Sequence, residues 1–178
     1  ESIHARARQA QARVIFAEGD DNRVLRAAVA YHRSGLGKAI VVGRDSDVSE
    51  RLAAEGLGDA VRELEIVNAA NTAHLATYKD FLYRRLQRQG FDPVDIHRLA
   101  ARDRHVFAAL MLAHGHGDAL VTGATRKSAH VLELINHVFE KDGFWEQVLR
   151  YAKQFCPPNK ASEAVGAIKR SAPSCQRP

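Results

Sequence analysis

The chain has 178 residues, of which 46% are hydrophobic, 26% charged and 7% aromatic, a composition that excludes disordered, collagen-like and disulfide-scaffold proteins. Its formal net charge is +5, and residues 140–178, with seven basic and four acidic side chains, contribute +3 of it. The rest of the chain carries only +2. We therefore expect no nucleic-acid partner, because phosphate-driven binding needs Lys and Arg clustered on one face.

No apolar stretch approaches the length needed to cross a bilayer, and no hydrophobic region follows the first residues. We therefore expect no membrane partner and a cytoplasmic location. Cys156 and Cys175 lack the paired spacing of metal ligands, so we expect reduced thiols and no metal site.

Short apolar runs that end at a glycine or a polar turn predict four buried strands. In chain order, these are residues 13–17, 38–42, 64–68 and 118–122. Apolar residues at helical spacing, with capping residues before them, predict helices in the remaining segments. These are residues 1–11, 22–34, 47–55, 72–89, 93–100, 103–114 and 127–139. Strands separated by helices pair in parallel through right-handed crossovers. We therefore expect an α/β fold, with an open, mainly parallel sheet and helices on both faces in three layers.

The composition changes after residue 139, which we take as the end of the α/β domain. Residues 144–155 are compatible with one more helix, and residues 159–178 contain little apolar material. We therefore predict two parts, an α/β domain over residues 1–139 and a divergent tail over residues 140–178 that is partly helical or disordered.

The turn after the first predicted strand is acidic. Glu18, Asp20 and Asp21 lie where ligands bind in open parallel sheets, at the carboxyl end of a strand. Three carboxylates repel phosphate, and the turn has neither the glycine pattern nor the lysine of a nucleotide-binding fingerprint. These residues either complement the dipole of the following helix, with Asp21 or Asn22 as its cap, or stand beside a ligand.

The turn after the fourth predicted strand has the chemistry of an anion site. It combines a glycine, three hydroxyl groups and two cations just before a helix, where free N–H groups and the positive end of the helix dipole attract phosphate. The candidate phosphate or acyl-CoA ligands are Thr122, Gly123, Thr125, Arg126, Lys127 and Ser128. The alternative is a turn in which a hydroxyl group only caps the helix. Arg102 is an additional candidate ligand, and no catalytic residue is predicted.

Histidines do not form a convincing metal site in this sequence. His114 and His116 fall in a glycine-rich connection, which we interpret as a surface turn. His130, Glu133 and His137 share one face of the last predicted helix, where local pairing accounts for their spacing.

Several segments together resemble a known family. They are residues 13–19, 23–28, 40–44 and 117–126, supported by residues 90–93, 102–103 and 107–111. In this order and spacing they resemble the phosphate acetyl/butyryltransferase family. More narrowly, they are similar to the phosphotransacetylase-like C-terminal domain of bacterial NADP-dependent malic enzymes. The resemblance spans residues 2–139.

The resemblance implies a fold that is incomplete relative to the family's acyltransferase unit, which has two α/β subdomains and about twice this length. It places Glu133 where the transferases carry an arginine that helps to hold phosphate. Reversing a charge about 4 Å from phosphate changes the interaction by several kcal/mol at an effective dielectric constant of about 20. The turn over residues 125–127 instead resembles the malic-enzyme branch.

The function implied by that branch is a non-catalytic, acetyl-CoA-sensing regulatory and oligomerisation domain of a malic enzyme. Its partners would be an acyl-CoA and further copies of itself. No cofactor is expected in this chain; NADP and a divalent metal would belong to the parent enzyme, which converts malate to pyruvate by oxidative decarboxylation. Two alternatives stay open: a phosphate acyltransferase that moves an acyl group between coenzyme A and phosphate, and a structural assembly domain.

Overall fold

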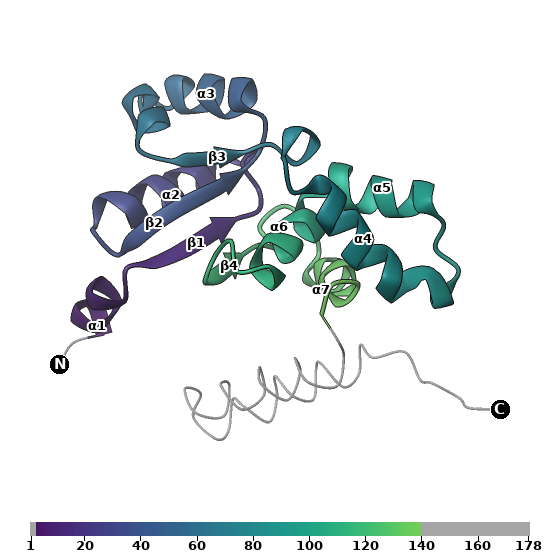
Figure 1. The fold of residues 1–178 in the computed structure, drawn as a ribbon. Helices are drawn as coiled ribbons and strands as arrows, with labels where there is room; N and C mark the ends of the chain where they lie inside the picture. Colours follow the sequence, from purple (N-terminus) through teal and green to yellow (C-terminus); the bar gives the residue numbers. More distant parts are fainter. Residues whose placement is uncertain (1–2, 140–178) are drawn as a thin grey trace. The chain divides into compact units, whose positions relative to one another are not determined.

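The computed structural model describes residues 3–139, which contain a single parallel sheet (Figure 1). Its four strands lie in the order β3-β2-β1-β4. They are β1 (Ala12–Phe16), β2 (Gly37–Val42), β3 (Glu65–Val67) and β4 (Ala119–Val121). Ile15 of β1 is in register with Ile40 of β2 on one side and with Leu120 of β4 on the other. β1 is therefore central, and β3 and β4 are short edge strands.

Seven α-helices and three short 3-10 helices complete the described part of the chain. The α-helices are α1 (Ile3–Ala10), α2 (Asn22–Arg33), α3 (Asp45–Ala54), α4 (Leu75–Leu86), α5 (Pro93–Arg102), α6 (Arg104–Ala113) and α7 (Ser128–Asn136). The 3-10 helices are η1 (Gly58–Arg62), η2 (Ala69–Asn71) and η3 (Gln87–Gln89). None of the helices over residues 3–139 is long and apolar enough to cross a membrane.

One face of the sheet is covered by α2 and α3. Val14 and Phe16 of β1 and Val41 of β2 point to this face and join one buried apolar cluster with residues of both helices. α2 contributes the fully buried Leu25 and Ala28, and α3 contributes the fully buried Val48 and Leu52. Side chains two apart on a strand share a face, so this cluster uses alternate residues of each strand.

The other face of the sheet is covered by helices around α6. This helix packs against β1 and β4, and also against α5 and α7, while α4 packs against α5 (Figure 1). Every residue of α6 from His105 to Met111 is buried, as expected for a helix enclosed on all sides. Helices on both faces of a parallel sheet confirm the predicted α/β class.

The strand order creates a switch point between β1 and β4. From β1 the chain passes to β2 and β3 on one side, and β4 then joins β1 on its other side. At such a point the connections leave the two neighbouring strands in opposite directions, and ligands bind outside their carboxyl ends. The turns that follow β1 and β4 therefore lie together at the edge where the fold favours a site.

The element boundaries differ from the prediction in two informative places. The helix predicted over residues 72–89 begins only at Leu75, because η2 and the turn after it come first, and it passes into η3 before Gly90 ends it with a φ of 87°. The cap predicted for α2 is confirmed at Asp21, whose side chain accepts hydrogen bonds from the N–H groups of Arg23 and Val24. The cap expected at Asp47 was wrong, because α3 begins at Asp45 and has no side-chain cap. The predicted tail over residues 140–178, with its helix over 144–155, lies outside the described residues.

Candidate functional site

Three segments meet at the switch point. They are residues 18–21 after β1, which we call the β1 turn, residues 103–105 at the start of α6, and residues 122–128 after β4, which we call the β4 turn. Hydrogen bonds and ion pairs join all three, although the β1 and β4 turns are more than 100 positions apart in the sequence. The fold therefore assembles the site from both halves of the domain.

Glu18 joins the β1 turn to the β4 turn. Its carboxylate is fully buried and accepts hydrogen bonds from the N–H groups of Ala124 and Thr125, both at 2.8 Å, and from the hydroxyl group of Thr125 at 2.5 Å. Burial opposes ionisation of this group, but the hydrogen bonds from Thr125 and Ala124 outweigh it, so the pKa of Glu18 lies below its ordinary value. Glu18 is therefore an ionised carboxylate held by the turn that the sequence assigned to phosphate.

Arg126 is positioned by the start of α6. Its guanidinium group lies 3.1 Å from Asp103, which also caps α6 by accepting hydrogen bonds from the N–H groups of His105 and Val106. The Arg126 side chain keeps 40% of its surface exposed. Lys127, the next residue, is exposed and forms no ion pair within residues 3–139. Both cations can therefore reach an anion outside the turn, and Arg126 must share its charge with Asp103.

Two further arginines tie the turns together. Arg104 pairs with Asp20 of the β1 turn and donates a hydrogen bond to the Thr125 hydroxyl group at 3.2 Å. Arg23 pairs with Asp21 at 2.8 Å and donates to the carbonyl oxygen of Ala124. The acidic β1 turn thus holds the surrounding arginines in place, which explains why three carboxylates and several cations coexist at one edge of the sheet.

His105 is the second buried titratable group at this edge. It is fully buried, and its Nδ1 lies 2.6 Å from the hydroxyl oxygen of Thr122, while its Nε2 has no hydrogen-bond partner in the described structure. Burial lowers the pKa of His105 against the opposing effect of Asp103 and Glu18. The neutral imidazole of His105 therefore holds Thr122, the first residue of the β4 turn, through a hydrogen bond inside the protein.

The structure brings most of the predicted ligands to one place. The six residues from the β4 turn all lie at the carboxyl end of β4, with Thr122 and Gly123 half-buried and the others exposed. Gly123 has a φ of 95°, a left-handed conformation that other residues rarely adopt. Arg102 is an exposed residue at the end of α5, and it is Arg104, at the start of α6, that contacts the β4 turn.

Sequence reasoning missed Arg104 and His105 and did not assign Glu18 to the β4 turn. Only Glu18 could have been recognised as a site residue from the sequence, because it directly follows the predicted buried strand over residues 13–17. Its partner depends on β1 and β4 being neighbours, which no local pattern reveals.

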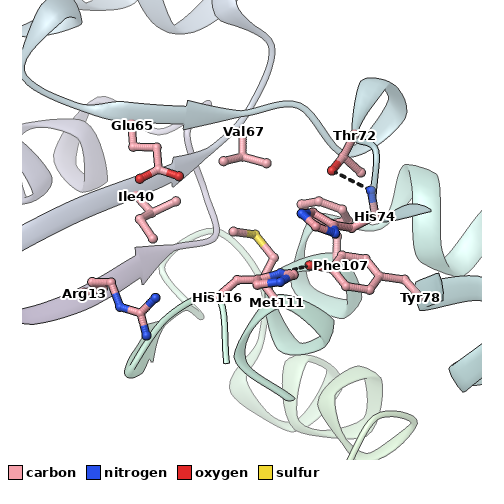
Figure 2. A pocket seen from close by; sticks show the side chains of 10 residues that line it. All are labelled: Arg13, Ile40, Glu65, Val67, Thr72, His74, Tyr78, Phe107, Met111 and His116. Carbon is pink, nitrogen blue, oxygen red and sulfur yellow. Dashed lines mark hydrogen bonds between the residues drawn. The ribbon is translucent and has the colours of Figure 1, made fainter. Parts of the chain in front are cut away.

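A separate cavity of about 330 Å³ lies on the second face of the sheet (Figure 2). Ile40, Val67, Phe107 and Met111 give it apolar walls, and the polar lining residues are Arg13, Glu65, Thr72, His74, Tyr78 and His116. Its volume is at the lower end of the range for small-molecule pockets. None of the predicted β4-turn ligands lines it, so this cavity and the anion site are different places.

The histidines of this region correct a sequence interpretation. His114 and His116 are not a simple surface turn, because both are half-buried and pack against the ring of Tyr78. The hydroxyl group of Tyr78 is also hydrogen bonded to Nδ1 of His116 (Figure 2). Burial raises the pKa of Tyr78 to about 12. Burial also lowers the pKa of His116, with the neighbouring His74 and His114 adding to the effect. Tyr78 and His116 are therefore both neutral near pH 7, and their contact joins α4 to the segment before β4.

His130, in α7, and His137, at its C-terminal cap, have different partners. His130 lies 3.8 Å from Glu133 on α7, and the ring of His137 packs edge-on against Phe91. Over residues 3–139, no group of three or more His, Cys, Asp or Glu side chains is arranged to hold a metal ion.

Known proteins match the chain over most of the described residues. A family model described as phosphate acetyl/butaryl transferase matches residues 1–144. The NADP-dependent malic enzyme of Rhizobium meliloti is 40% identical over 131 residues, which cover 74% of this chain and 17% of that enzyme. The phosphate acetyltransferase of Clostridium acetobutylicum is 29% identical over 132 residues, which cover 74% of this chain and 39% of that enzyme.

Solved structures share the fold. A phosphotransacetylase from Streptococcus pyogenes matches with a TM-score of 0.64 and 25% identity, over 75% of this chain and 42% of that one. The EutD phosphotransacetylase from Staphylococcus aureus matches with a TM-score of 0.67 at 19% identity, over 80% of this chain and 45% of that one. The chain thus spans under half of these structures and under a fifth of the Rhizobium malic enzyme. The family model nevertheless covers most of the chain, which belongs to the phosphate acetyl/butaryl transferase family.

Proposed function

We propose that this chain is a non-catalytic regulatory domain of a malic enzyme, and that it binds acetyl-CoA or a related acyl-CoA at the β4 turn. The 40% identity to the Rhizobium NADP-dependent malic enzyme supports the association with that class. NADP, a divalent metal and the oxidation of malate would belong to the rest of such an enzyme. The domain would act in the cytoplasm and assemble with further copies of itself.

Coenzyme A carries phosphate groups that suit the outer surface of the β4 turn. Arg126 and Lys127 present positive charge there, and Ser128 is the first residue of α7, whose N–H groups have no side-chain cap. Guanidinium and ammonium groups bind phosphate oxygens through charge-assisted hydrogen bonds, and a helix N-terminus adds to the attraction. Thr122 and Gly123 shape the turn from its half-buried side.

The carboxylate of Glu18 is the observation that favours binding without transfer. Acyl transfer needs N–H groups aimed at the oxygen on which negative charge develops. In the β4 turn, the N–H groups of Ala124 and Thr125 already donate to Glu18, and the Thr125 hydroxyl group does the same. The donors best placed to stabilise a developing negative charge are therefore occupied by the protein itself.

Regulation follows if acyl-CoA binds one arrangement of the parent enzyme more tightly than another, because only differential affinity shifts an equilibrium. The purely structural alternative, an assembly domain, predicts instead that self-association is indifferent to the ligand. Sedimentation of the chain with and without acetyl-CoA separates the two: a ligand-dependent change in association supports the sensor.

Calorimetric titration of acetyl-CoA into the 178-residue chain tests the proposed binding. Arg126→Ala and Lys127→Ala should each weaken binding by about tenfold or more, because each removes hydrogen bonds between charged groups. Arg62→Ala is the matched control, since Arg62 is exposed in η1, which precedes β3 at the opposite edge of the sheet. Equal affinity of the Arg126→Ala variant and the unaltered chain would contradict the proposal.

The acyltransferase alternative is favoured by the similarity to the Clostridium phosphate acetyltransferase and to the Streptococcus phosphotransacetylase structure. Acetyl phosphate and coenzyme A are mixed with the chain, and formation of the thioester is followed. We expect no thioester above the uncatalysed background. Turnover that is lost in Arg126→Ala would establish the transferase in place of the regulatory domain.

A further inference from the structure

We infer that the β4 turn contains a second, inner oxyanion site that Glu18 keeps closed, and that Glu18 thereby excludes small free anions such as inorganic phosphate. The inner site consists of the N–H groups of Ala124 and Thr125 and the hydroxyl group of Thr125. Both Glu18 oxygens are used: Oε2 accepts from Ala124, and Oε1 accepts both Thr125 hydrogen bonds. Successive main-chain N–H groups that converge in this way form the concave anion sites found in many phosphate-binding turns.

The geometry shows that this inner site recognises an oxyanion. Both N–H donors lie 2.8 Å from their carboxylate oxygen, and the hydroxyl group lies at 2.5 Å, which are the short distances typical of hydrogen bonds to a charged acceptor. The bound oxyanion is fully buried. A formate, acetate or phosphate ion offers the same pair of acceptor oxygens, so it could occupy the space of the carboxylate if the side chain were absent.

The backbone holds Glu18 in this position. Gly19, the next residue, packs so closely on β2 that a Cβ atom there would lie 2.7 Å from the carbonyl oxygen of Val42. The N–H group of Gly19 also donates to that carbonyl oxygen at 3.1 Å. The main chain beside Glu18 therefore cannot move closer to β2, and the carboxylate keeps its contact with the β4 turn.

A covalently attached carboxylate competes strongly with free ions. Its effective concentration at the turn exceeds that of a dissolved anion, because the attached side chain loses little translational and rotational entropy when it binds. Inorganic phosphate would have to displace it, whereas the phosphates of a larger ligand can meet Arg126 and Lys127 outside the turn. Glu18 is therefore a specificity-determining residue, which favours tethered phosphates over free ones. This inference concerns the site of the proposed function, but its test uses no acyl-CoA, so the two can fail separately.

The test compares the melting temperatures of the unaltered chain, Glu18→Ala and Glu18→Gln in formate, acetate or inorganic phosphate, with chloride at equal ionic strength as the reference. Glu18→Ala opens the inner site, and a bound oxyanion should raise its melting temperature by about 3–6 °C at ten times the dissociation constant. Glu18→Gln is the matched control, because its amide removes the charge but fills the same volume. The unaltered chain and Glu18→Gln should show no such rise.

The inference is overturned if these oxyanions stabilise all three proteins equally, or if Glu18→Ala folds and gains nothing from any of them. If Glu18→Ala does not fold in any of these salts, hydrogen exchange and chemical shifts of the unaltered chain test the inference instead. Its amide signals of Ala124 and Thr125 should exchange slowly with solvent and stay unmoved in millimolar phosphate. Fast exchange, or a saturable shift of these two signals, would show that the inner site is open and the inference wrong.

Discussion

Replacing Asp103 should change stability and ligand affinity in opposite directions. The Asp103 carboxylate caps α6 through the N–H groups of His105 and Val106, at 2.9 Å and 3.2 Å, and it pairs with Arg126 at 3.1 Å. The cap contributes about 0.5–2 kcal/mol to the free energy of unfolding. The ion pair contributes about 0–1 kcal/mol, because 40% of the Arg126 side chain is exposed to solvent.

Asp103→Ala removes both interactions, so the free energy of unfolding should fall by about 0.5–3 kcal/mol. For a protein of this size, the melting temperature should fall by about 1–12 °C. Asp103→Asn removes the charge but keeps a side chain that caps helices equally well. Its melting temperature should therefore stay much closer to that of the unaltered chain.

Both variants free Arg126, which no longer shares its charge with a carboxylate. The affinity for acetyl-CoA should therefore rise by about two- to fivefold, which corresponds to the energy of an ion pair at the surface. Urea unfolding measures the stability, and calorimetric titration measures the affinity. Asp95→Asn, which removes the same charge from the start of α5, should leave the affinity unchanged. A weaker affinity in Asp103→Asn than in Asp95→Asn would refute the assignment of Arg126 to the ligand.

Three further predictions concern the fold around the site. Gly19→Ala should lower the free energy of unfolding by more than about 1 kcal/mol in urea, because its Cβ would lie 2.7 Å from the Val42 carbonyl oxygen. Gly58→Ala is the control, since its Cβ would meet nothing nearer than 3.7 Å, and its stability should stay within about 1 kcal/mol of that of the unaltered chain. Phe107→Ala should cost about 3–5 kcal/mol in the same assay, since this ring is fully buried in α6; a loss below 1 kcal/mol would contradict the central position of that helix. Acidification from pH 7.5 to 5 should lower the free energy of unfolding. Burial lowers the pKa of His105, His116 and His137 in the folded protein, so the unfolded chain binds protons more readily than the folded one. Stability is therefore greatest above the unfolded-state pKa of about 6.5 and falls as the pH drops below it. A stability that rises over this range would show that these imidazoles are protonated in the folded protein.

Local sequence patterns predicted the elements well and their pairing only in outline. The strand over residues 13–17 and the cap at Asp21 were readable because strand and capping signals are local. The order β3-β2-β1-β4 was not predicted, and the contact between Glu18 and the β4 turn depends on it. The acidic β1 turn therefore suggested repulsion of phosphate, when its first carboxylate in fact occupies the N–H groups of the opposite turn.

The arginines show a second limit of sequence reasoning. Arg102 and Arg104 flank Asp103, which ends α5 and begins α6. The change of helix turns the two side chains into different surroundings, and Arg104 is the one that donates to Thr125. A boundary can be read from a capping residue, but the direction of the next helix is set by packing against the sheet. The cluster of His114, His116 and Tyr78 could not be predicted for the same reason: packing brings together residues from segments far apart in the chain.

Mapping the backbone amide signals of the 178-residue chain during an acetyl-CoA titration tests the central proposal most directly. The shifts should gather at residues 126–130 and at the start of α6, where Arg126 meets Asp103. They should be lost in Arg126→Ala and retained in Arg62→Ala. Shifts that gather instead around His74, Tyr78 and His116 would place the ligand in the cavity on the second face of the sheet and contradict the assignment to the β4 turn.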